Sequence, residues 1–421
     1  MKNGTTDRVL KGRFKALALG VVASVFATGV LAKDAPNPFA GVSANYDGID
    51  TLKPMTLRWS DFFSPTSSAS LGSRAFMDYV SAATDGKVKF EPYWSNALFS
   101  PAEAPASIAS GIADIGPILP GYTPAKYPIN NWFGGFAVEA KGGAPYGSLI
   151  ITAAGGEFFA SNESIKAEFV NAGLHVLGVH GNDSYDMLCT SPIASLADAK
   201  GKNVRTGGQV HADEVTALGM VPVPIASSET YEAITRGLVD CTVQKPDQYF
   251  TGGLTDIKGD LYWIDLELSG FVSAALAINN DIWMDLPPVL QQILTDASMK
   301  FLVQKAAGVQ VGTVEFGKLI EAGKIHYVKP DDELLSALTN FQETRLEEMV
   351  AEAPAGVTDP AGAVKQFRAL TEKWRDVVSN ELKISPIPTD VAKIPAYWSQ
   401  DFDFDGYAER LSKELGVGVS Q

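Results

Sequence analysis

Apolar and polar positions along residues 55–285 follow two alternating patterns. MTLRW, which begins at Met55, and KVKFEPYW further on have the apolar spacing of strands. Between them, LGSRAFMDYVSAAT has helical spacing, with Leu71, Phe76 and Val80 on roughly one face. The same alternation of short strands and helices recurs from GLHVLGVH to LVDCTVQ. This pattern predicts an α/β fold built on mixed, mostly parallel sheets flanked by helices.

The pattern becomes mainly helical beyond Asp285. A long helical tract follows Pro287 and Pro288, and two more helical segments cover residues 331–350 and 363–378. Residues 384–421 are rich in proline and aromatic residues. We expect this last stretch to form an extended strap across the body that ends in a short helix.

The first 32 residues resemble an export signal. Basic residues precede an uncharged run of 17 residues, which ends with small side chains at Val30 and Ala32. This arrangement predicts a signal peptide (residues 1–32) that is cleaved after Ala32, and therefore an exported protein. The alternative is an uncleaved membrane anchor, because 17 apolar residues could just span a bilayer. Residues 33–54 are rich in Pro, Gly and Asp, which favours a mobile leader.

Composition narrows the possible functions. The chain has 421 residues, of which 46% are hydrophobic and 20% charged, so it can bury a core in two or three domains. Its net charge is −15, and removal of residues 1–32 takes away five basic residues and one acid, which gives about −19. So acidic a protein lacks the basic face that binds a phosphate backbone, and we expect no nucleic-acid partner.

The two cysteines, Cys189 and Cys241, lie in the short strand-like runs MLCT and CTVQ. An oxidising compartment permits a disulfide between them, and two buried free thiols are the alternative. Neither is assigned to catalysis.

Sequence signatures of enzymes are missing. The chain contains no P-loop, no GxSxG, no HExxH and no CxxC, and its four histidines show no metal-ligand spacing. We therefore expect no cofactor and no metal. A secreted enzyme that uses an acid such as Asp61 or Glu91 remains the alternative from a different class.

The segment KGKNVRTGG places Arg205 near the end of a strand, directly before two glycines. Open α/β sheets bind ligands at the carboxyl ends of their strands, and a guanidinium matches a carboxylate with two parallel hydrogen bonds. Arg205 is therefore a candidate carboxylate ligand. The alternative is a surface arginine that pairs with a nearby acid.

Three segments in order resemble the solute-binding proteins of tripartite ATP-independent periplasmic (TRAP) transporters. Residues 85–116 contain GIADIG, residues 201–246 contain GKNVR, PVP, ETYEA and GLVD, and residues 276–294 contain NNDIWMDLP. Each motif is weak alone, but the ordered set is specific and covers most of residues 55–310.

This resemblance implies two lobes that close over a ligand, with a long helix bracing both. We expect lobe I to comprise residues 55–182 and 271–310, and lobe II residues 183–270 and 311–383. It further implies a periplasmic monomer that delivers a small carboxylate to membrane permease subunits without chemical change. A binding protein of an ATP-driven importer is the nearer alternative.

The resemblance also assigns residues. Arg205 corresponds to the arginine that clamps the ligand carboxylate, and Ser227 to a position that often contacts ligand. After GLVD the family commonly has an acid or amide and then an asparagine, where this chain has Gln244 and Lys245. Lys245 would either supply a second cation to the ligand or turn outward.

A second departure concerns charge. Many dicarboxylate and sialic acid binders carry another arginine where this chain has Tyr185, and a phenol brings no positive charge. The resemblance therefore implies a monocarboxylate with an apolar or hydroxylated body. Five aromatic residues are candidate walls of its pocket, with ordinary core packing as the alternative for each: Trp59, Phe62, Tyr93, Trp94 and Trp132.

Overall fold

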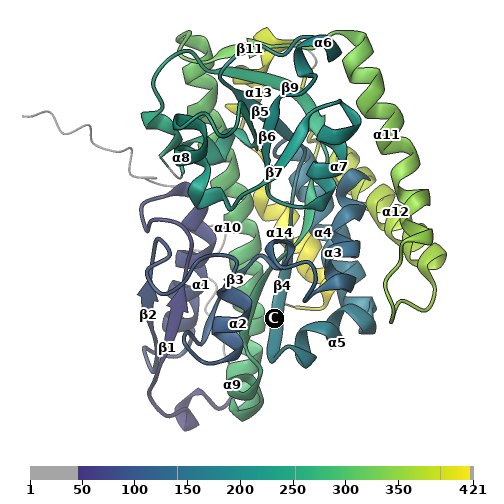
Figure 1. Cartoon of the computed structure of the whole chain (residues 1–421). Coiled ribbons are helices and arrows are strands. Elements are labelled where there is room, and N and C mark those ends of the chain that lie inside the picture. The colour runs from purple at the N-terminus through teal and green to yellow at the C-terminus, as the bar shows by residue number, and fades with distance from the viewer. Residues whose placement is uncertain (1–45, 140, 252, 389, 418–421) are drawn as a thin grey trace, which may run out of the picture.

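The computed structural model describes residues 46–417, except residues 140, 252 and 389. Two sheets lie one above the other in Figure 1, and a long helix runs past both. The predicted signal peptide and residues 33–45 of the predicted leader lie outside the described residues. None of the helices described within 46–417 is long and apolar enough to cross a membrane.

The first lobe is built on a sheet of five strands, in which β10 runs opposite to the other four. In spatial order the strands are β2 (Val88–Tyr93), β1 (Met55–Ser60), β3 (Ile115–Ile118), β10 (Phe271–Asn279) and β4 (Leu174–Asn182). Five helices pack around it: α1 (Leu71–Ala83), α2 (Ala104–Ala109), α3 (Pro128–Gly134), α4 (Tyr146–Ser161) and α5 (Glu163–Asn171).

The second lobe is built on a sheet of six strands, in which β5 runs opposite to the other five. In spatial order they are β11 (His326–Val328), β9 (Tyr262–Leu268), β5 (Tyr185–Cys189), β8 (Cys241–Gln244), β6 (Asn203–Thr206) and β7 (Val221–Pro224). Its short helices are α6 (Leu196–Ala199), α7 (Gln209–Ala217) and α8 (Thr230–Thr235). The two sheets confirm the predicted mixed, mostly parallel α/β fold.

Two short segments cross between the sheets, from β4 to β5 and from β9 back to β10, and residues 280–325 later carry the chain across again to β11. The two crossings touch at Gly270, where a Cβ atom would lie 2.3 Å from the carbonyl oxygen of Asn182. Only glycine allows so close an approach of two backbones. These two short connections therefore run side by side as a tight pair.

Helix α10 (Pro288–Glu321) is the predicted long brace, and it follows the short helix α9 (Asn280–Asp285). It contacts α1 and β4 of the first lobe and the turn η6 (Pro246–Phe250) of the second. Two glycines let neighbouring backbone come close, because a Cβ on Gly308 would lie 2.2 Å from Ser68 O, and one on Gly312 would lie 2.8 Å from Asp247 Cα. The position of η6, which borders the site described below, depends on this contact.

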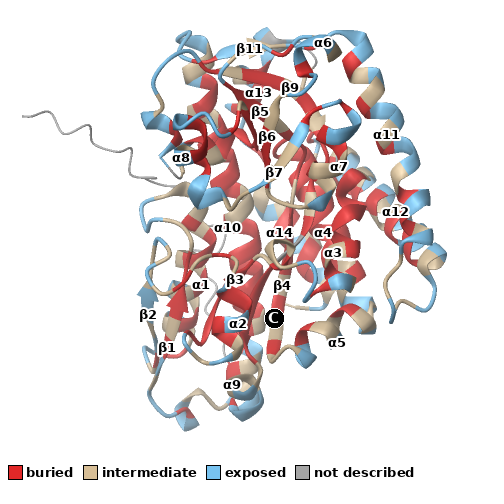
Figure 2. Cartoon of the chain, viewed as in Figure 1, coloured by how far each residue is buried: buried red, intermediate tan, exposed pale blue. Residues whose placement is uncertain are grey.

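The remaining helices differ in part from the predicted division. Helix α11 (Asp332–Ala351) packs on α7 of the second lobe, and Figure 2 shows exposed residues along its outer side. Helix α12 (Pro360–Asp376) instead packs on α4, and its Phe367 joins Phe133, Phe136 and Phe158 in an aromatic cluster. The assignment of all of residues 311–383 to lobe II is therefore wrong for α12, because its apolar face completes the core of the first lobe.

Two terminal predictions also need correction. Tyr46 and Leu52 of the predicted mobile leader are buried in the core, and the Tyr46 hydroxyl donates to Asp296 at 2.8 Å and lies 2.5 Å from the Tyr79 hydroxyl. Residues 384–417 contain two helices, α13 (Ile394–Trp398) and α14 (Phe404–Leu415), instead of one extended strap with a terminal helix. These helices lie against α10 and, for α14, also against α4.

Cys189 and Cys241 form a disulfide, which decides the alternative that the sequence left open. The two residues are direct partners in the antiparallel pairing of β5 with β8, and their Cα atoms are 4.1 Å apart. The bond links positions 52 residues apart in the chain.

We predict that reduction of this disulfide lowers the free energy of unfolding by about 2–4 kcal/mol, because an open chain gains conformational freedom when it unfolds. Urea unfolding with and without reductant measures the difference. The double variant Cys189→Ala/Cys241→Ala is the control, and its midpoint should not respond to reductant. Two free thiols in the oxidised, denatured protein would contradict the bond.

Candidate functional site

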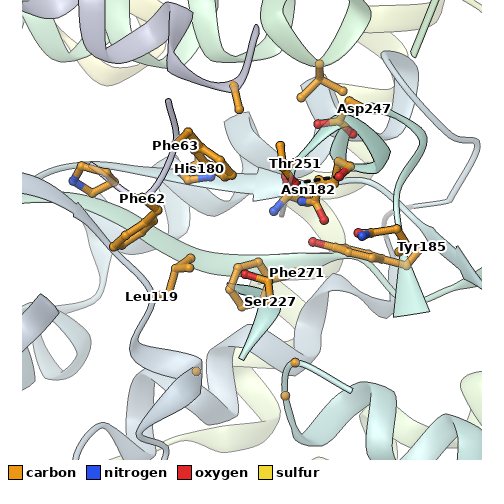
Figure 3. Close-up of a pocket in the computed structure, with 18 of the residues that line it drawn as sticks. Phe62, Phe63, Leu119, His180, Asn182, Tyr185, Ser227, Asp247, Thr251 and Phe271 are labelled. Atoms are coloured by element: carbon orange, nitrogen blue, oxygen red, sulfur yellow. Dashed lines mark hydrogen bonds between the residues drawn. The ribbon is translucent and has the colours of Figure 1, made fainter. Parts of the chain in front are cut away.

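A pocket lies between the lobes, beside the crossing strands and α10 (Figure 3). From the first lobe it is lined by residues that include Phe62, Phe63, Leu119, Tyr122, His180 and Asn182. From the second lobe it is lined by Tyr185, Arg205, Ser227, Gln244, Asp247 and Thr251, among others. Phe271 of β10 and three residues of α10 complete it: Phe301, Lys305 and Val309.

Arg205 projects from β6 into this pocket and is only 5% exposed. Its Nε donates to the carbonyl oxygen of Ile225 at 2.8 Å, which fixes the side chain. Within the described part of the chain no carboxylate lies within 4 Å of its guanidinium, so it is not the paired surface arginine of the alternative interpretation. A buried cation without an acid is poised to bind an anion.

The structure explains why glycines follow Arg205 in the sequence. A Cβ on Gly207 would lie 3.2 Å from Arg205 Nη2, so a larger residue would crowd the guanidinium. Gly207 and Gly208 also line the pocket themselves. The RTGG motif thus keeps space open beside the charged group.

Tyr122 reaches the same point from the first lobe, and the sequence analysis missed it. It lies in the turn η3 (Pro120–Tyr122), directly after β3. Arg205 Nη2 is 3.5 Å from its hydroxyl, and the backbone N–H of Ser227 is 3.4 Å away. The GIADIG motif predicts a loop at the pocket, but nothing in the sequence singles out this tyrosine within it.

Tyr185, Ser227, Gln244 and Phe62 line the pocket together with Arg205. The Tyr185 ring lies 4.7 Å from the His211 ring, and burial raises the pKa of Tyr185 to about 12. The phenol is therefore neutral at physiological pH and offers a hydrogen bond without a charge.

Lys245 neither supplies a cation to the pocket nor turns outward, so both expectations for it are wrong. Its side chain is fully buried and does not line the pocket; its Nζ binds Asp183 and lies 3.8 Å from Asp247 Oδ1. Burial alone would lower the pKa of Lys245, but attraction to Asp183 and Asp247 outweighs it and raises the pKa. Asp183 also accepts a hydrogen bond from Ser148 Oγ at 2.7 Å. Lys245 is therefore neutralised inside the protein.

Lys305 is a second cation at the pocket, and the sequence analysis did not identify it. Its Nζ lies 5.1 Å from the centre of the Phe63 ring and 3.4 Å from the carbonyl oxygen of Ala69. Burial lowers the pKa of Lys305, and the charges of Asp61 and Asp247 oppose this shift. In the sequence it is one lysine within a long helical tract, and its spacing does not reveal which face meets the pocket.

Four of the five predicted aromatic walls lie outside this pocket. Trp59 is buried in the core of the first lobe, 5.3 Å from the Phe76 ring. Tyr93 donates to Glu91 at the edge strand β2, Trp94 follows that strand, and Trp132 donates to the carbonyl oxygen of Met349. These side chains pack in the core or at the sheet edge, as most large aromatic residues do.

The acids named for an enzyme alternative are engaged in structural bonds. Asp61 lines the pocket, but it accepts hydrogen bonds from Ser73 Oγ at 2.5 Å and from the backbone N–H of Phe63 at 3.0 Å. Glu91 lies on the edge strand and does not line the pocket. Among the described residues no group of three or more His, Cys, Asp and Glu side chains is placed to hold a metal ion.

The fold and the pocket together define a two-lobed binding protein. Residues 60–353 match the family model of bacterial extracellular solute-binding proteins, family 7, over more than half of the chain. The chain belongs to this family.

Similarity to individual proteins agrees with the family. The chain is 22% identical over 243 residues to the C4-dicarboxylate-binding periplasmic protein of Rhodobacter capsulatus, which covers 56% of this chain and 68% of that protein. A TRAP periplasmic solute-binding protein from Bordetella bronchiseptica with bound mandelate has a similar structure, with a TM-score of 0.66 and 23% identity. That match covers 76% of this chain and 99% of the other.

A second solved structure has the same fold. It is a TRAP solute-binding protein from Rhodoferax ferrireducens with copurified benzoate, with a TM-score of 0.66, 20% identity, and coverage of 77% of this chain and 99% of that one. Both relatives are covered almost entirely, so the remainder of this chain is additional to the fold they share.

We predict that Lys245→Met lowers the free energy of unfolding by about 3–5 kcal/mol, because it leaves Asp183 buried without its cation. Urea unfolding measures the loss. Lys318→Met is the matched control, since Lys318 pairs with Glu315 on the surface and such pairs contribute only about 0–1 kcal/mol. Equal effects of the two substitutions would contradict the structural role of Lys245.

Proposed function

We propose that this protein is the periplasmic receptor of a TRAP transporter and captures a small organic acid between its lobes. In this proposal residues 1–32 direct export and are removed, and the liganded receptor delivers its cargo to the membrane permease subunits. The family and the TRAP receptors of the same fold support this assignment over a receptor of an ATP-driven importer.

The observation that carries the proposal is the buried guanidinium of Arg205. Its Nε is occupied by Ile225, while the rest of the guanidinium faces the pocket with no acid from the described residues. A ligand carboxylate there would form charge-assisted hydrogen bonds, each contributing about 1.5–3 kcal/mol. Tyr122 and Ser227 lie beside the guanidinium and would contact the same carboxylate.

The charges of the pocket favour a monocarboxylate. Tyr185 is neutral, and Lys245 is already paired with Asp183. Lys305 faces the opposing charges of Asp61 and Asp247. A second carboxylate would therefore find only Lys305, whose charge Asp61 and Asp247 already oppose.

We further propose that the ligand leaves unchanged. Asp61 accepts hydrogen bonds from Ser73 and from the backbone of Phe63, so both of its oxygens already have structural partners. A receptor that releases its ligand needs no general base. Mass spectrometry of an added acid, recovered after denaturation, tests this point; a converted product would establish the enzyme alternative.

We predict that Arg205→Ala weakens binding of the organic acid about 100-fold or more while the fold is retained. A thermal-unfolding screen of residues 33–421 against organic acids finds the ligand, because binding to the native state alone raises stability by about 2.7 kcal/mol at a hundred times the dissociation constant. Calorimetry then compares the variant with the wild type.

Arg236→Ala is the matched control, since Arg236 lies in the same lobe with an exposed side chain paired to Glu232. It removes the same charge and should leave affinity unchanged. Normal binding by Arg205→Ala would refute the anchor, and the highest affinity for dicarboxylates would refute the charge argument.

A further inference from the structure

A buried carboxylate of α7 holds the segment that crosses from β9 to β10. Glu214 is fully buried, and its Oε1 accepts hydrogen bonds from Ser269 Oγ at 2.6 Å and from the backbone N–H of Ser269 at 2.9 Å. His211, one turn earlier on α7, donates from Nε2 to the carbonyl oxygen of the same residue at 2.9 Å. The N–H, carbonyl and hydroxyl groups of Ser269 are therefore all bound to one helix.

This helix connects the crossing segment with the pocket. Ser269 directly precedes Gly270, where the two crossing segments touch. At the other end of the connection, Val210 and His211 in the first turn of α7 line the pocket, as does Gly208 just before the helix. The position of this pocket wall is therefore tied to the position of the crossing segment.

Helix α11 meets the same carboxylate. Gln342 of α11 donates from Nε2 to Glu214 Oε1 at 2.7 Å and to the carbonyl oxygen of Glu267 in β9 at 3.1 Å. The two helices pack against each other (Figure 1). We call the hydrogen bonds of Glu214 to Ser269 and Gln342 the Glu214 clamp. Loss of the carboxylate would leave the buried N–H and hydroxyl of Ser269 without their acceptor, which is costly.

The clamp contains a group that titrates near neutral pH. Burial raises the pKa of Glu214 to about 7, although the hydrogen bonds from Ser269 and Gln342 oppose this shift. Burial lowers the pKa of His211 to about 4, so its ring is neutral at physiological pH. A change of pH around neutrality therefore changes the charge of Glu214 and leaves that of His211 unchanged.

Other charged groups surround the clamp. Lys141, which lies before α4, attracts the carboxylates of both Glu214 and Glu267. Burial also raises the pKa of Glu267 in β9. Arg345 of α11 is paired with Asp213 of α7 at 3.4 Å. An experiment on the clamp must therefore separate the titration of Glu214 from that of Glu267.

Ionisation of Glu214 loosens the clamp. Its pKa of about 7 in the folded protein lies above the ordinary value of 4.5, so the buried group keeps a proton that a hydrated carboxyl group loses. Opening of the clamp admits water and therefore releases this proton to solvent between about pH 4.5 and 7. Opening becomes easier as the pH rises through this range, and the clamp is firmest below it.

We propose that Glu214 is a positioning residue for ligand capture: it fixes the crossing segment to α7 and α11, and loss of its proton loosens this connection. The clamp itself does not depend on the proposed receptor function. Its effect on capture rests on that function, because α7 forms a wall of the pocket that holds Arg205.

Amide hydrogen exchange of Ser269, measured by NMR without ligand between pH 5 and 8, tests the clamp. After correction for intrinsic exchange, we expect protection in the wild type to fall about 10- to 100-fold over this range. In Glu214→Gln the amide oxygen replaces Oε1 without titrating, so protection should change by about threefold or less. Glu232→Gln is the matched control, since Glu232 is exposed and pairs with Arg236, and it should keep the full pH response.

Glu214→Ala tests the effect on capture. The probe is the organic acid that stabilises the wild type most in the thermal screen, and calorimetry at pH 7 should show binding weakened about 10-fold or more. Glu214→Gln should restore most of the affinity that the alanine variant loses. Thermal unfolding without ligand shows whether each variant folds. If Glu214→Ala does not fold, Ser269→Ala replaces it, with binding weakened about threefold because one donor is lost.

The outcomes separate this proposal from the receptor function. If the pH response of Ser269 persists in Glu214→Gln, another acid such as Glu267 causes it, which overturns the clamp and leaves the receptor standing. Unchanged affinity in a folded Glu214→Ala overturns the positioning role alone. If no acid binds in the screen, the receptor function and the effect on capture both fail, while the exchange data still decide the clamp.

Discussion

Burying a positive charge without a neighbouring carboxylate is costly, and this constraint governs the junction between the two lobes. Two basic side chains at the junction of the lobes are almost fully buried, and they meet that cost differently. Lys245 is neutralised by Asp183 and Asp247 within the protein. Arg205 has no acid among the described residues near it, and in the proposed function the ligand carboxylate compensates its charge. An anionic ligand that neutralises Arg205 would also bring Tyr122 of the first lobe and Ser227 of the second onto one group.

Glycines at three positions allow the backbone segments around the lobe junction to come into close contact. Gly270 lets the two crossing segments touch, and Gly308 and Gly312 let α10 lie against both lobes. Helices α13 and α14 then cover α10 beyond the part of the chain that matches the family. The hinge is therefore narrow while the support behind it is broad. That combination fits the proposed capture of a ligand between the two lobes.

Much of the fold could be read from the sequence because its signals are local. Apolar patterns predicted strands in both sheets, although not β9, β10 or β11, and the tract after Pro288 predicted α10. Helix α12 was misassigned because its apolar face does not say which lobe it completes; Phe367 finds its partners in α4 and its neighbours. Likewise Trp59 and Phe62 are three positions apart, and only their three-dimensional surroundings place one in the core and the other at the pocket.

By itself the sequence determined the α/β class, the ordered family motifs and the candidate anchor Arg205, since each depends on residues close together in the chain. The tertiary structure decided the disulfide, because it depends on the register of β5 with β8. It also decided the role of Lys245, because its partner Asp183 lies far away in the sequence, between β4 and β5. It also decided that Tyr122, Lys305, His180 and Asp247 share one pocket. Those four come from separate elements, and a contact between distant segments leaves no periodic or spacing signal in one sequence.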